Sequence, residues 1–360
     1  MTFFFVTFTT IFTTHHYAVP IKSTNFAAPL KTHRGHREHQ PPLHPHDVSP
    51  IIYYKLYIIY YLVKVATIGF FDGVHLGHQH LIRQVVAEAH RRGATSAVVT
   101  FGSHPRTVIT TTPMPLLTTP AEKQSLLLSC GIDEIINLDF TPQLSQMSAH
   151  DFMQQILQHQ HAVDTLIIGY DHRFGHNRSE TFDDYVRYGQ SLSIDVIRAE
   201  AFTLDGQAVS SSRIRHLLQD DGDIATANRL LGHPYTLSGT VVEGYRRGHI
   251  IGFPTANLRA DESKLLPHDG VYSIEADTPY GTFDGMLNIG LNPTYNNTDR
   301  TVEAHLFDFN HQLYGQHISL RLYHHIRNEQ PFSSPDELTE QLGRDRDTIT
   351  RLMAQRRNAI

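Results

Sequence analysis

Two histidines flank a glycine in a short turn, and this spacing suits phosphate chemistry. The turn spans residues 72–78 (DGVHLGH), follows an apolar β-branched run and precedes a helical pattern. Backbone N–H groups at a helix start and the positive end of the helix dipole attract anions, and Gly77 lets a phosphate approach the backbone. His75 and His78 add side-chain donors at the same place. We therefore predict an anion site here; the alternative is a pair of surface histidines in a chain with 26 of them.

A second cluster combines serine hydroxyls with arginines at a predicted helix start, residues 210–215 (SSSRIR). Hydroxyls donate hydrogen bonds locally, and a guanidinium fork binds phosphate through two bonds. Ser211, Ser212 and Arg215 therefore suit the oxygens of a triphosphate. The alternative is an ordinary serine-capped helix start.

A third cluster, residues 246–257 (RRGHIIGFPTAN), combines glycines with neutral oxygen ligands. Gly248 and Gly252 allow a loop whose N–H groups cradle phosphates. Thr255 and Asn257 offer hard oxygens to Mg²⁺, which takes few protein ligands and relies on phosphates for the rest. The GK[ST] ending of a Walker A loop is missing, so the alternative is a turn that leads into a strand.

Alternating strand and helix patterns position the first two clusters. Apolar β-branched runs predict buried strands, and apolar residues at helical spacing predict the helices between them. Because ligands bind at the carboxyl ends of such parallel strands, loop 102–106 joins the candidate site. The expected strands are 65–70, 94–101, 131–140, 163–169 and 193–197, and the expected helices are one that ends before Gly93, then 119–128, 148–159 with Ser148 as N-cap, and 224–231.

From residue 232 the pattern changes to short alternating strands with Gly/Pro punctuation, which predicts a small antiparallel barrel. Ser334, Pro335 and Glu337 form a start signal for a C-terminal helix over residues 333–356. We therefore expect an α/β plus β fold, with a Rossmann-like domain over residues 64–231 and a barrel domain with a C-terminal helix over residues 232–360. The expected barrel strands are 235–244, 270–276, 281–289, 301–307 and 317–325.

Composition limits the partners and the compartment. A net charge of −6 gives no basic footprint for nucleic acid, and no apolar run reaches the roughly 18–20 residues that span a bilayer. Cys130 is the only cysteine, which excludes an internal disulfide and a cysteine-based zinc site. We expect a cytoplasmic protein without nucleic-acid or membrane partners.

Residues 1–63 show no hydrophobic period like that of the rest of the chain. They suggest an accessory or disordered N-terminal extension, or an over-extended gene start.

The string GFFDGVHLGHQHLI, residues 69–82, resembles the HxGH signature of the nucleotidyltransferase superfamily and, more narrowly, bacterial bifunctional riboflavin kinase/FAD synthetases. Residues 210–215 resemble that family's SSTxIR motif, with Ser212 in place of threonine. GFPTAN, residues 252–257, is typical of its kinase module. Further kinase-like strings follow in order at residues 288–290 (NIG), 293–294 (PT), 302–305 (VEAH) and 313–315 (LYG).

The resemblance implies an enzyme with two activities. The barrel would phosphorylate riboflavin to FMN with ATP and Mg²⁺, and the first domain would adenylylate FMN with a second ATP, giving FAD and pyrophosphate. His75 and His78 would stabilise charge on the α-phosphate, and Arg215 would hold the departing pyrophosphate. Glu303 would be the base or orienting group for the riboflavin 5′-hydroxyl, because a primary alcohol is a poor nucleophile at neutral pH. Flavoprotein clients are candidate recipients of the products.

The resemblance also implies further binding residues. Asp171 would accept hydrogen bonds from a ribose or hold a cation, although an Asx-turn explains it equally well. The remaining flavin contacts would be Phe174 and Asn288, and the ATP or phosphate contacts would be Gly69, Phe70, Asp72, Gly73, Gly77, Ser211 and Ser212 in the first domain and Gly248, Gly252 and Pro254 in the barrel.

Three other functions stay open at this point. Gly102, Ser103 and His172 depart from the family pattern, which allows a monofunctional riboflavin kinase with a degenerate transferase module. HxGH alone also fits a nucleotidyltransferase for another phosphate ester, but the GFPTAN barrel argues against it. A non-catalytic flavin-binding protein is the third alternative. The intact set of Thr255, Asn257 and Glu303 argues against it, because binding flavin needs no magnesium ligands.

Overall fold

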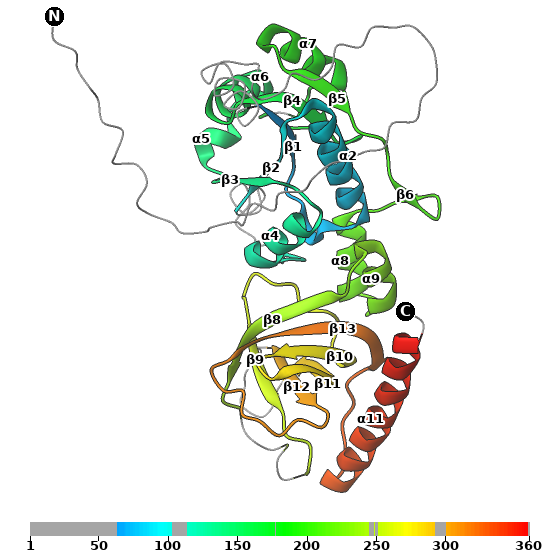
Figure 1. The fold of residues 1–360 in the computed structure, drawn as a ribbon. Helices are drawn as coiled ribbons and strands as arrows, with labels where there is room; N and C mark the ends of the chain where they lie inside the picture. The colour runs from blue at the N-terminus through cyan, green and yellow to red at the C-terminus, as the bar shows by residue number, and fades with distance from the viewer. Residues whose placement is uncertain are drawn as a thin grey trace, which may run out of the picture. The chain divides into compact units, whose positions relative to one another are not determined.

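The computed structural model describes residues 63–102, 114–176, 178–244, 248, 251–291 and 300–358 (Figure 1). The expectations for residues 1–62, for Ser103 and for the strings at residues 246–247 and 293–294 lie outside these ranges. A parallel sheet with helices comes first along the chain and a barrel follows, as the sequence predicts. Within the described ranges, no helix is long and apolar enough to cross a membrane.

The first module is built on a five-stranded parallel sheet in the order β3-β2-β1-β4-β5. The strand order reverses between β1 and β4, and the loops that follow such strands form the ligand-binding edge of an open α/β sheet. Their apolar, β-branched residues are buried, as the sequence pattern predicts. The strands are β1 (Lys64–Ile68), β2 (Thr95–Phe101), β3 (Glu134–Leu138), β4 (Val163–Ile168) and β5 (Asp195–Arg198).

Helix ends follow the predicted signals closely. Helix α2 (Leu76–Arg92) ends at Gly93, which has a left-handed φ of 63°. Helix α4 (Pro120–Ser129) begins with a capping box between Thr119 and Glu122. The remaining elements of this module are the 3₁₀ turn η1 (Asp72–Val74), α5 (Pro142–Ser145), α7 (Phe182–Leu192), the hairpin β6 (Thr203–Leu204) and β7 (Gln207–Ala208), α8 (Ser211–Gln219) and α9 (Ile224–Leu231).

Most predicted strands shift by one or two residues at an end, no range was predicted for α5, α7 or the β6–β7 hairpin, and two elements differ further. Ser148 caps a helix as predicted, but α6 (Ala149–Asp151) passes directly into a π-helix, η2 (Phe152–Gln160). The strand predicted over residues 131–140 is shorter, Glu134–Leu138, and just before it the Asp133 carboxylate accepts hydrogen bonds from the Ser96 N–H at 2.8 Å and hydroxyl at 2.6 Å. Residues 131–133 form a turn, and β3 begins only at Glu134.

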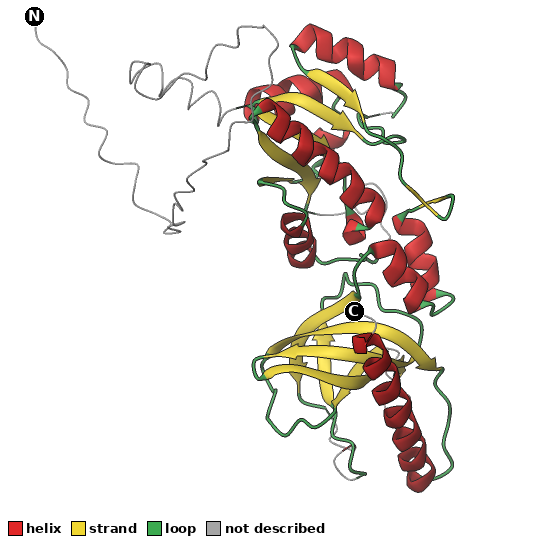
Figure 2. Ribbon diagram, turned by 45° about the vertical axis from the view of Figure 1, so that its right-hand side comes forward, coloured by secondary structure: helices red, strands yellow, loops and turns green. Residues whose placement is uncertain are grey.

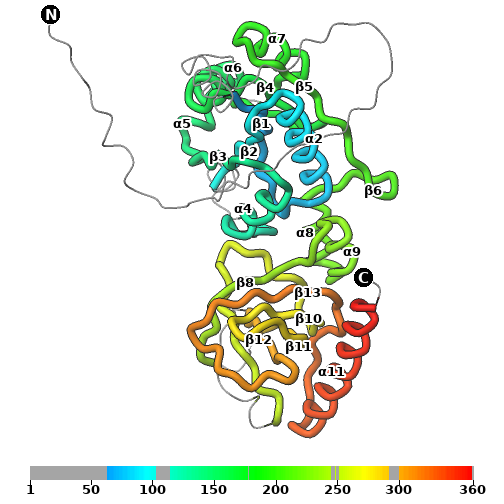
Figure 3. Tube along the Cα trace, viewed as in Figure 1, coloured from blue at the N-terminus to red at the C-terminus, as the bar shows by residue number. Residues whose placement is uncertain are grey.

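The second module is a closed six-stranded barrel in the order β10-β11-β12-β9-β8-β13, with helix α11 (Pro335–Asn358) packed outside it (Figure 3). Five of the six strands were predicted. The sixth, β9, was given no range: it buries only Leu258 and shows no alternation, and it was expected only as the strand into which the turn at residues 246–257 would lead. The strands are β8 (Tyr235–Val242), β9 (Ala256–Ala260), β10 (Gly270–Thr278), β11 (Gly281–Leu291), β12 (Arg300–Leu306) and β13 (His317–Arg327).

One hydrophobic core crosses the domain boundary predicted at residue 232. Ile214, Leu218 and Leu230 on α8 and α9 belong to the same buried cluster as Leu237 and Leu322 inside the barrel. Figure 2 shows the two helices next to the barrel strands. The first module therefore supplies side chains that close the core of the second.

Candidate active sites in the two modules

A strained turn between β1 and α2 carries the two histidines. Phe71 has φ 56° and Val74 has φ 38°, values that are rare for non-glycine residues and rarest for β-branched ones. Gly73 between them has φ 79°, and a methyl group there would come to 2.9 Å from Leu117 Cδ1. Backbone strain is thus concentrated where the chain presents His75 and the start of α2.

His75 and His78 form a stacked pair of imidazoles. Their ring centroids are 3.6 Å apart with an interplanar angle of 17°, and His75 Nδ1 caps α2 by accepting the His78 N–H at 3.3 Å. This bond assigns the His75 proton to Nε2. Burial lowers the pKa of His75 to about 4 and holds the pKa of His78 well below 6.5. His78 Nδ1 is buried without a hydrogen-bond partner in the described part of the chain.

Gly77 lies between His75 and His78 in the sequence and packs beside the His75 ring. A methyl group at Gly77 would lie 3.2 Å from His75 Cε1, closer than most side chains tolerate. The glycine therefore keeps space beside the His75 ring.

Asp72 is buried and holds its neighbours in place. Its exposed fraction is 2%, and its carboxylate accepts hydrogen bonds from the Leu117 N–H at 3.1 Å and the Thr118 N–H at 3.1 Å. Arg215 forms an ion pair with the same carboxylate and donates to the Pro115 carbonyl at 3.3 Å. Asp72 therefore orients Arg215, and this geometry favours Arg215 over Asp72 for a direct phosphate contact.

The serine cluster begins α8 beside the same turn. Ser210 is the N-cap and accepts the Arg213 N–H at 3.3 Å, so the capping interpretation holds for this residue. Ser211 donates to the Asp72 carbonyl at 3.0 Å, which joins α8 to the histidine turn. Ser212 is exposed.

Lys123 on α4 was not predicted and lies at the carboxyl ends of β1 and β2. Its ammonium group donates to the Phe101 carbonyl at 2.8 Å, and to the Phe70 carbonyl and the Thr100 hydroxyl at 3.3 Å each, and it lies 4.3 Å from the Phe70 ring centroid. Burial lowers the pKa of Lys123 to about 8. All three hydrogen-bond acceptors are neutral, so a buried positive charge faces the edge where an anionic ligand would bind. Gly69, which precedes Phe70, donates its N–H to the Val99 carbonyl at 3.0 Å.

The loop after β4 separates the predicted flavin contacts. Asp171 is exposed, whereas Phe174 is 8% exposed and stacks on Tyr185 with ring centroids 4.5 Å apart. The flavin contact of Phe174 stays a prediction, and its side chain is the less accessible of the two. Burial lowers the pKa of His172 to about 4, and its Nε2 is buried without a hydrogen-bond partner in the described ranges.

In the barrel, strand pairing brings the predicted kinase residues together. Glu303 on β12 lies opposite Asn257 on β9 and opposite Asn288 on β11. The Thr255 hydroxyl donates to Glu303 Oε2 at 3.4 Å. Asn288 donates its side-chain amide to Glu329 at 3.0 Å. The three clustered side chains Thr255, Asn257 and Glu303 thus offer oxygen ligands, the type that Mg²⁺ prefers.

The glycine-containing loop that precedes β9 is held by hydrogen bonds of its backbone. The Phe253 N–H donates to the Gly248 carbonyl at 2.8 Å, and Gly252 has φ 80°. The Pro254 carbonyl contacts His305 Nδ1 at 2.8 Å, which fixes the start of β9. In the described ranges, no group of three or more His, Cys, Asp or Glu residues could hold a metal, so a magnesium site here would depend on the neutral oxygens and on phosphates.

The parallel sheet with its HxGH turn defines the first module as a nucleotidyltransferase domain, joined to a closed barrel of the riboflavin kinase type. Residues 62–213 match the family model of FAD synthetase, and residues 231–353 match that of riboflavin kinase. The chain belongs to the family of bifunctional riboflavin kinase/FMN adenylyltransferases. It is therefore an enzyme that carries both transferase domains, which settles the class left open by the motifs alone.

The chain is similar in sequence to curated relatives over most of its length. The bifunctional riboflavin kinase/FMN adenylyltransferase of Listeria monocytogenes is 34% identical over 78% of this chain and 90% of its own length. The Escherichia coli relative of the same name is 37% identical over 78% and 90%. A crystal structure from Streptococcus pneumoniae, described as a macrolide-efflux protein, superposes with a TM-score of 0.73 at 30% identity over 80% of this chain and 94% of that one.

Proposed function

We propose that adenylylation of FMN takes place at the edge of the parallel sheet, between the histidine turn and the start of α8. The observation that carries this assignment is the stacked His75–His78 pair at the N-terminus of α2, next to an Arg215 held by buried Asp72. Helix start, imidazoles and guanidinium converge on one anion-binding position.

In this reaction an oxygen of the FMN phosphate attacks the α-phosphorus of ATP, the bond to the β-phosphate breaks, and pyrophosphate leaves. His75, with its proton on Nε2, donates a hydrogen bond to the α-phosphate and remains neutral throughout, because burial disfavours the imidazolium and so lowers the pKa of this side chain. Arg215 and the Lys123 charge stabilise the departing pyrophosphate. Asp171 is placed on the exposed loop where it can accept a ribose hydroxyl.

The barrel carries the kinase reaction in this proposal. Glu303 orients the 5′-hydroxyl of riboflavin and takes up its proton as the γ-phosphate of ATP is transferred. Thr255 and Asn257 would hold Mg²⁺, which would neutralise phosphate charge when bound. Asn288, two strands from Asn257 in the barrel, would contact the flavin.

The substrates are riboflavin, FMN and ATP, and Mg²⁺ is the proposed metal. We place the enzyme in the cytoplasm, without nucleic-acid or membrane partners, and flavoproteins are the proposed recipients of FMN and FAD. A reducing compartment is consistent with the single, unpaired Cys130.

Two variants test the division of labour. Purified protein is incubated with riboflavin, ATP and Mg²⁺, and riboflavin, FMN and FAD are separated by chromatography. We expect His78→Ala to accumulate FMN without FAD, and Glu303→Ala to form FAD only when FMN is supplied. Equal loss of both products in His78→Ala would contradict separate sites, and FMN as the only product of the unaltered enzyme would favour the monofunctional kinase.

A further inference from the structure

A short segment that precedes α4 connects the kinase module to the histidine turn. Leu116 forms a parallel bridge with Lys264, and its N–H and carbonyl bond to the Ser263 carbonyl at 2.7 Å and the Leu265 N–H at 2.8 Å. Lys264 lies in the loop between β9 and β10, so this segment is paired with the barrel by backbone hydrogen bonds.

The backbone N–H and the backbone carbonyl of the next residue, Leu117, have different partners. Its N–H donates to Asp72 Oδ2 at 3.1 Å, and its carbonyl accepts the Lys264 ammonium at 2.7 Å. The same ammonium pairs with Glu122 at 2.5 Å, and Glu122 in turn accepts the Thr119 N–H at 3.0 Å. Lys264 is 5% exposed, so these bonds are shielded from water and from screening by salt.

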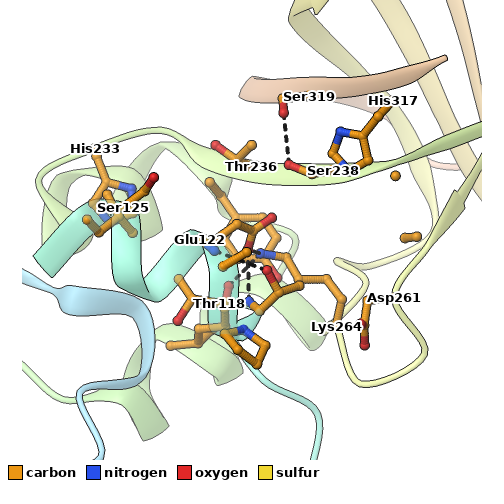
Figure 4. Close-up of a pocket in the computed structure, with 18 of the residues that line it drawn as sticks. Thr118, Glu122, Ser125, His233, Thr236, Ser238, Asp261, Lys264, His317 and Ser319 are labelled. Atoms are coloured by element: carbon orange, nitrogen blue, oxygen red, sulfur yellow. Dashed lines mark hydrogen bonds and ion pairs between the residues drawn. The ribbon is translucent and has the colours of Figure 1, made fainter. Parts of the chain in front are cut away.

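On the transferase side, the segment holds the turn from two directions. Thr118 accepts the Gly73 N–H at 3.1 Å through its hydroxyl and donates its own N–H to Asp72 at 3.1 Å. Asp72 then holds Arg215. A continuous series of buried hydrogen bonds therefore runs from Lys264 through Leu117 to Asp72 and Arg215. Figure 4 shows Lys264, Glu122 and Thr118 converging in the pocket at this junction.

We propose that Lys264, a residue of the kinase module, is a positioning residue for adenylyl transfer, because it fixes the Leu117 peptide that fixes Asp72 and Arg215. This inference rests on the transferase site proposed above. The Lys264 ammonium bonds to Leu117 and Glu122, on the transferase side of the junction, so the kinase reaction serves as the internal reference. Substitutions along a connected series of this kind change the coupling between two sites by roughly two- to thirtyfold, and we expect an effect of about tenfold here.

The test compares Lys264→Met with Lys64→Met as a matched control. Lys64 also forms an ion pair, with Glu134 at 2.9 Å, but it lies at the opposite end of β1 from the turn. We expect Lys264→Met to lower kcat for FAD formation about tenfold while FMN formation stays within about twofold, and Lys64→Met to change neither activity. Unchanged FAD formation in folded Lys264→Met would overturn the proposal.

A second variant separates positioning from stability. Lys264→Met leaves the Glu122 carboxylate buried without its partner, whereas Lys264→Met/Glu122→Gln removes both charges and is expected to recover the thermal midpoint. A positioning role predicts that FAD formation stays low in this double variant, because the Leu117 carbonyl still lacks its donor. Recovery of FAD formation together with the midpoint would overturn the proposal. FAD formation by the unaltered enzyme and its loss in His78→Ala test the transferase site independently of this inference.

Discussion

Replacing Asp72 by asparagine isolates the charge that organises the transferase site. The substitution keeps the side-chain shape and one acceptor oxygen but removes the charge that faces Arg215. Asp72 is 2% exposed, and the Arg215 side chain is 14% exposed. The asparagine amide also brings N–H donors toward a position where the Leu117 N–H, the Thr118 N–H and Arg215 all donate.

The expected loss of stability follows from this enclosure. Removing one partner of a buried ion pair destabilises by about 3–5 kcal/mol, because the other charge stays buried without compensation. The partial exposure of Arg215 places the value near the lower end, about 3 kcal/mol. For two modules of about 300 residues in total that unfold together, a loss of that order lowers the thermal midpoint by roughly 5 °C. Misplacement of Arg215 and the turn should also lower kcat/KM for FAD formation by about a hundredfold.

The assay measures unfolding in denaturant and both activities for Asp72→Asn, Arg215→Met and the double variant. Replacing the whole pair removes the uncompensated charge, so the double variant should be more stable than the sum of the single changes predicts, by about 2–3 kcal/mol. FAD formation should stay low in all three. Additive stability changes, or wild-type FAD formation in Asp72→Asn, would refute the reasoning that this pair positions the site.

Three further predictions concern single groups. The pKa of Lys123 is lowered to about 8, so KM for ATP in FAD formation should rise as pH increases through about 8, and Lys123→Met should abolish that dependence. The pKa of His75 falls from 6.5 in the unfolded chain to about 4 in the folded chain, so between these pH values the unfolded chain binds a proton that the folded chain excludes. The free energy of unfolding should therefore drop by about 3 kcal/mol as the pH falls from 6.5 to 4. Urea titrations should show a smaller pH dependence for His75→Asn. Glu303→Gln should slow FMN formation by about 10²–10⁴-fold while FAD formation from supplied FMN continues, and an unchanged kinase rate would remove Glu303 from its proposed role.

The sequence predicted the two modules because the local signals were strong. β-Branched runs became β1, β2 and β4, the predicted N-cap Ser148 marks a real helix start, and the helix predicted over residues 119–128 is α4. The π-helix after α6 carries no such signal, since its apolar spacing is also compatible with an α-helix. Strand β9 was expected only as the continuation of a turn, without a range, because a strand that buries one side chain shows no alternation of apolar and polar residues.

The motifs also located the histidine turn and the barrel cluster, but they did not predict the buried ion pairs and hydrogen bonds that hold these residues in position. The Asp72–Arg215 pair joins residues 143 positions apart, and no spacing rule predicts it. Lys123 could have been found from its spacing: it lies four residues before buried Leu127, on the buried face of α4. Lys264 shows no such signal, because its burial depends on packing between segments that are distant in sequence.

Because α8 and α9 share a core with the barrel, we expect the two modules to unfold as one cooperative unit, although their chemistry is divided. Asn228 on α9 donates to the Leu322 carbonyl at 2.8 Å and accepts the Tyr235 N–H at 2.7 Å, so α9 is tied to both β8 and β13. A ligand bound to the barrel should therefore raise the unfolding temperature of the parallel sheet as well. Cutting the chain after residue 231 would expose Leu230 and Ile224 to water, so each half would need part of the other to fold.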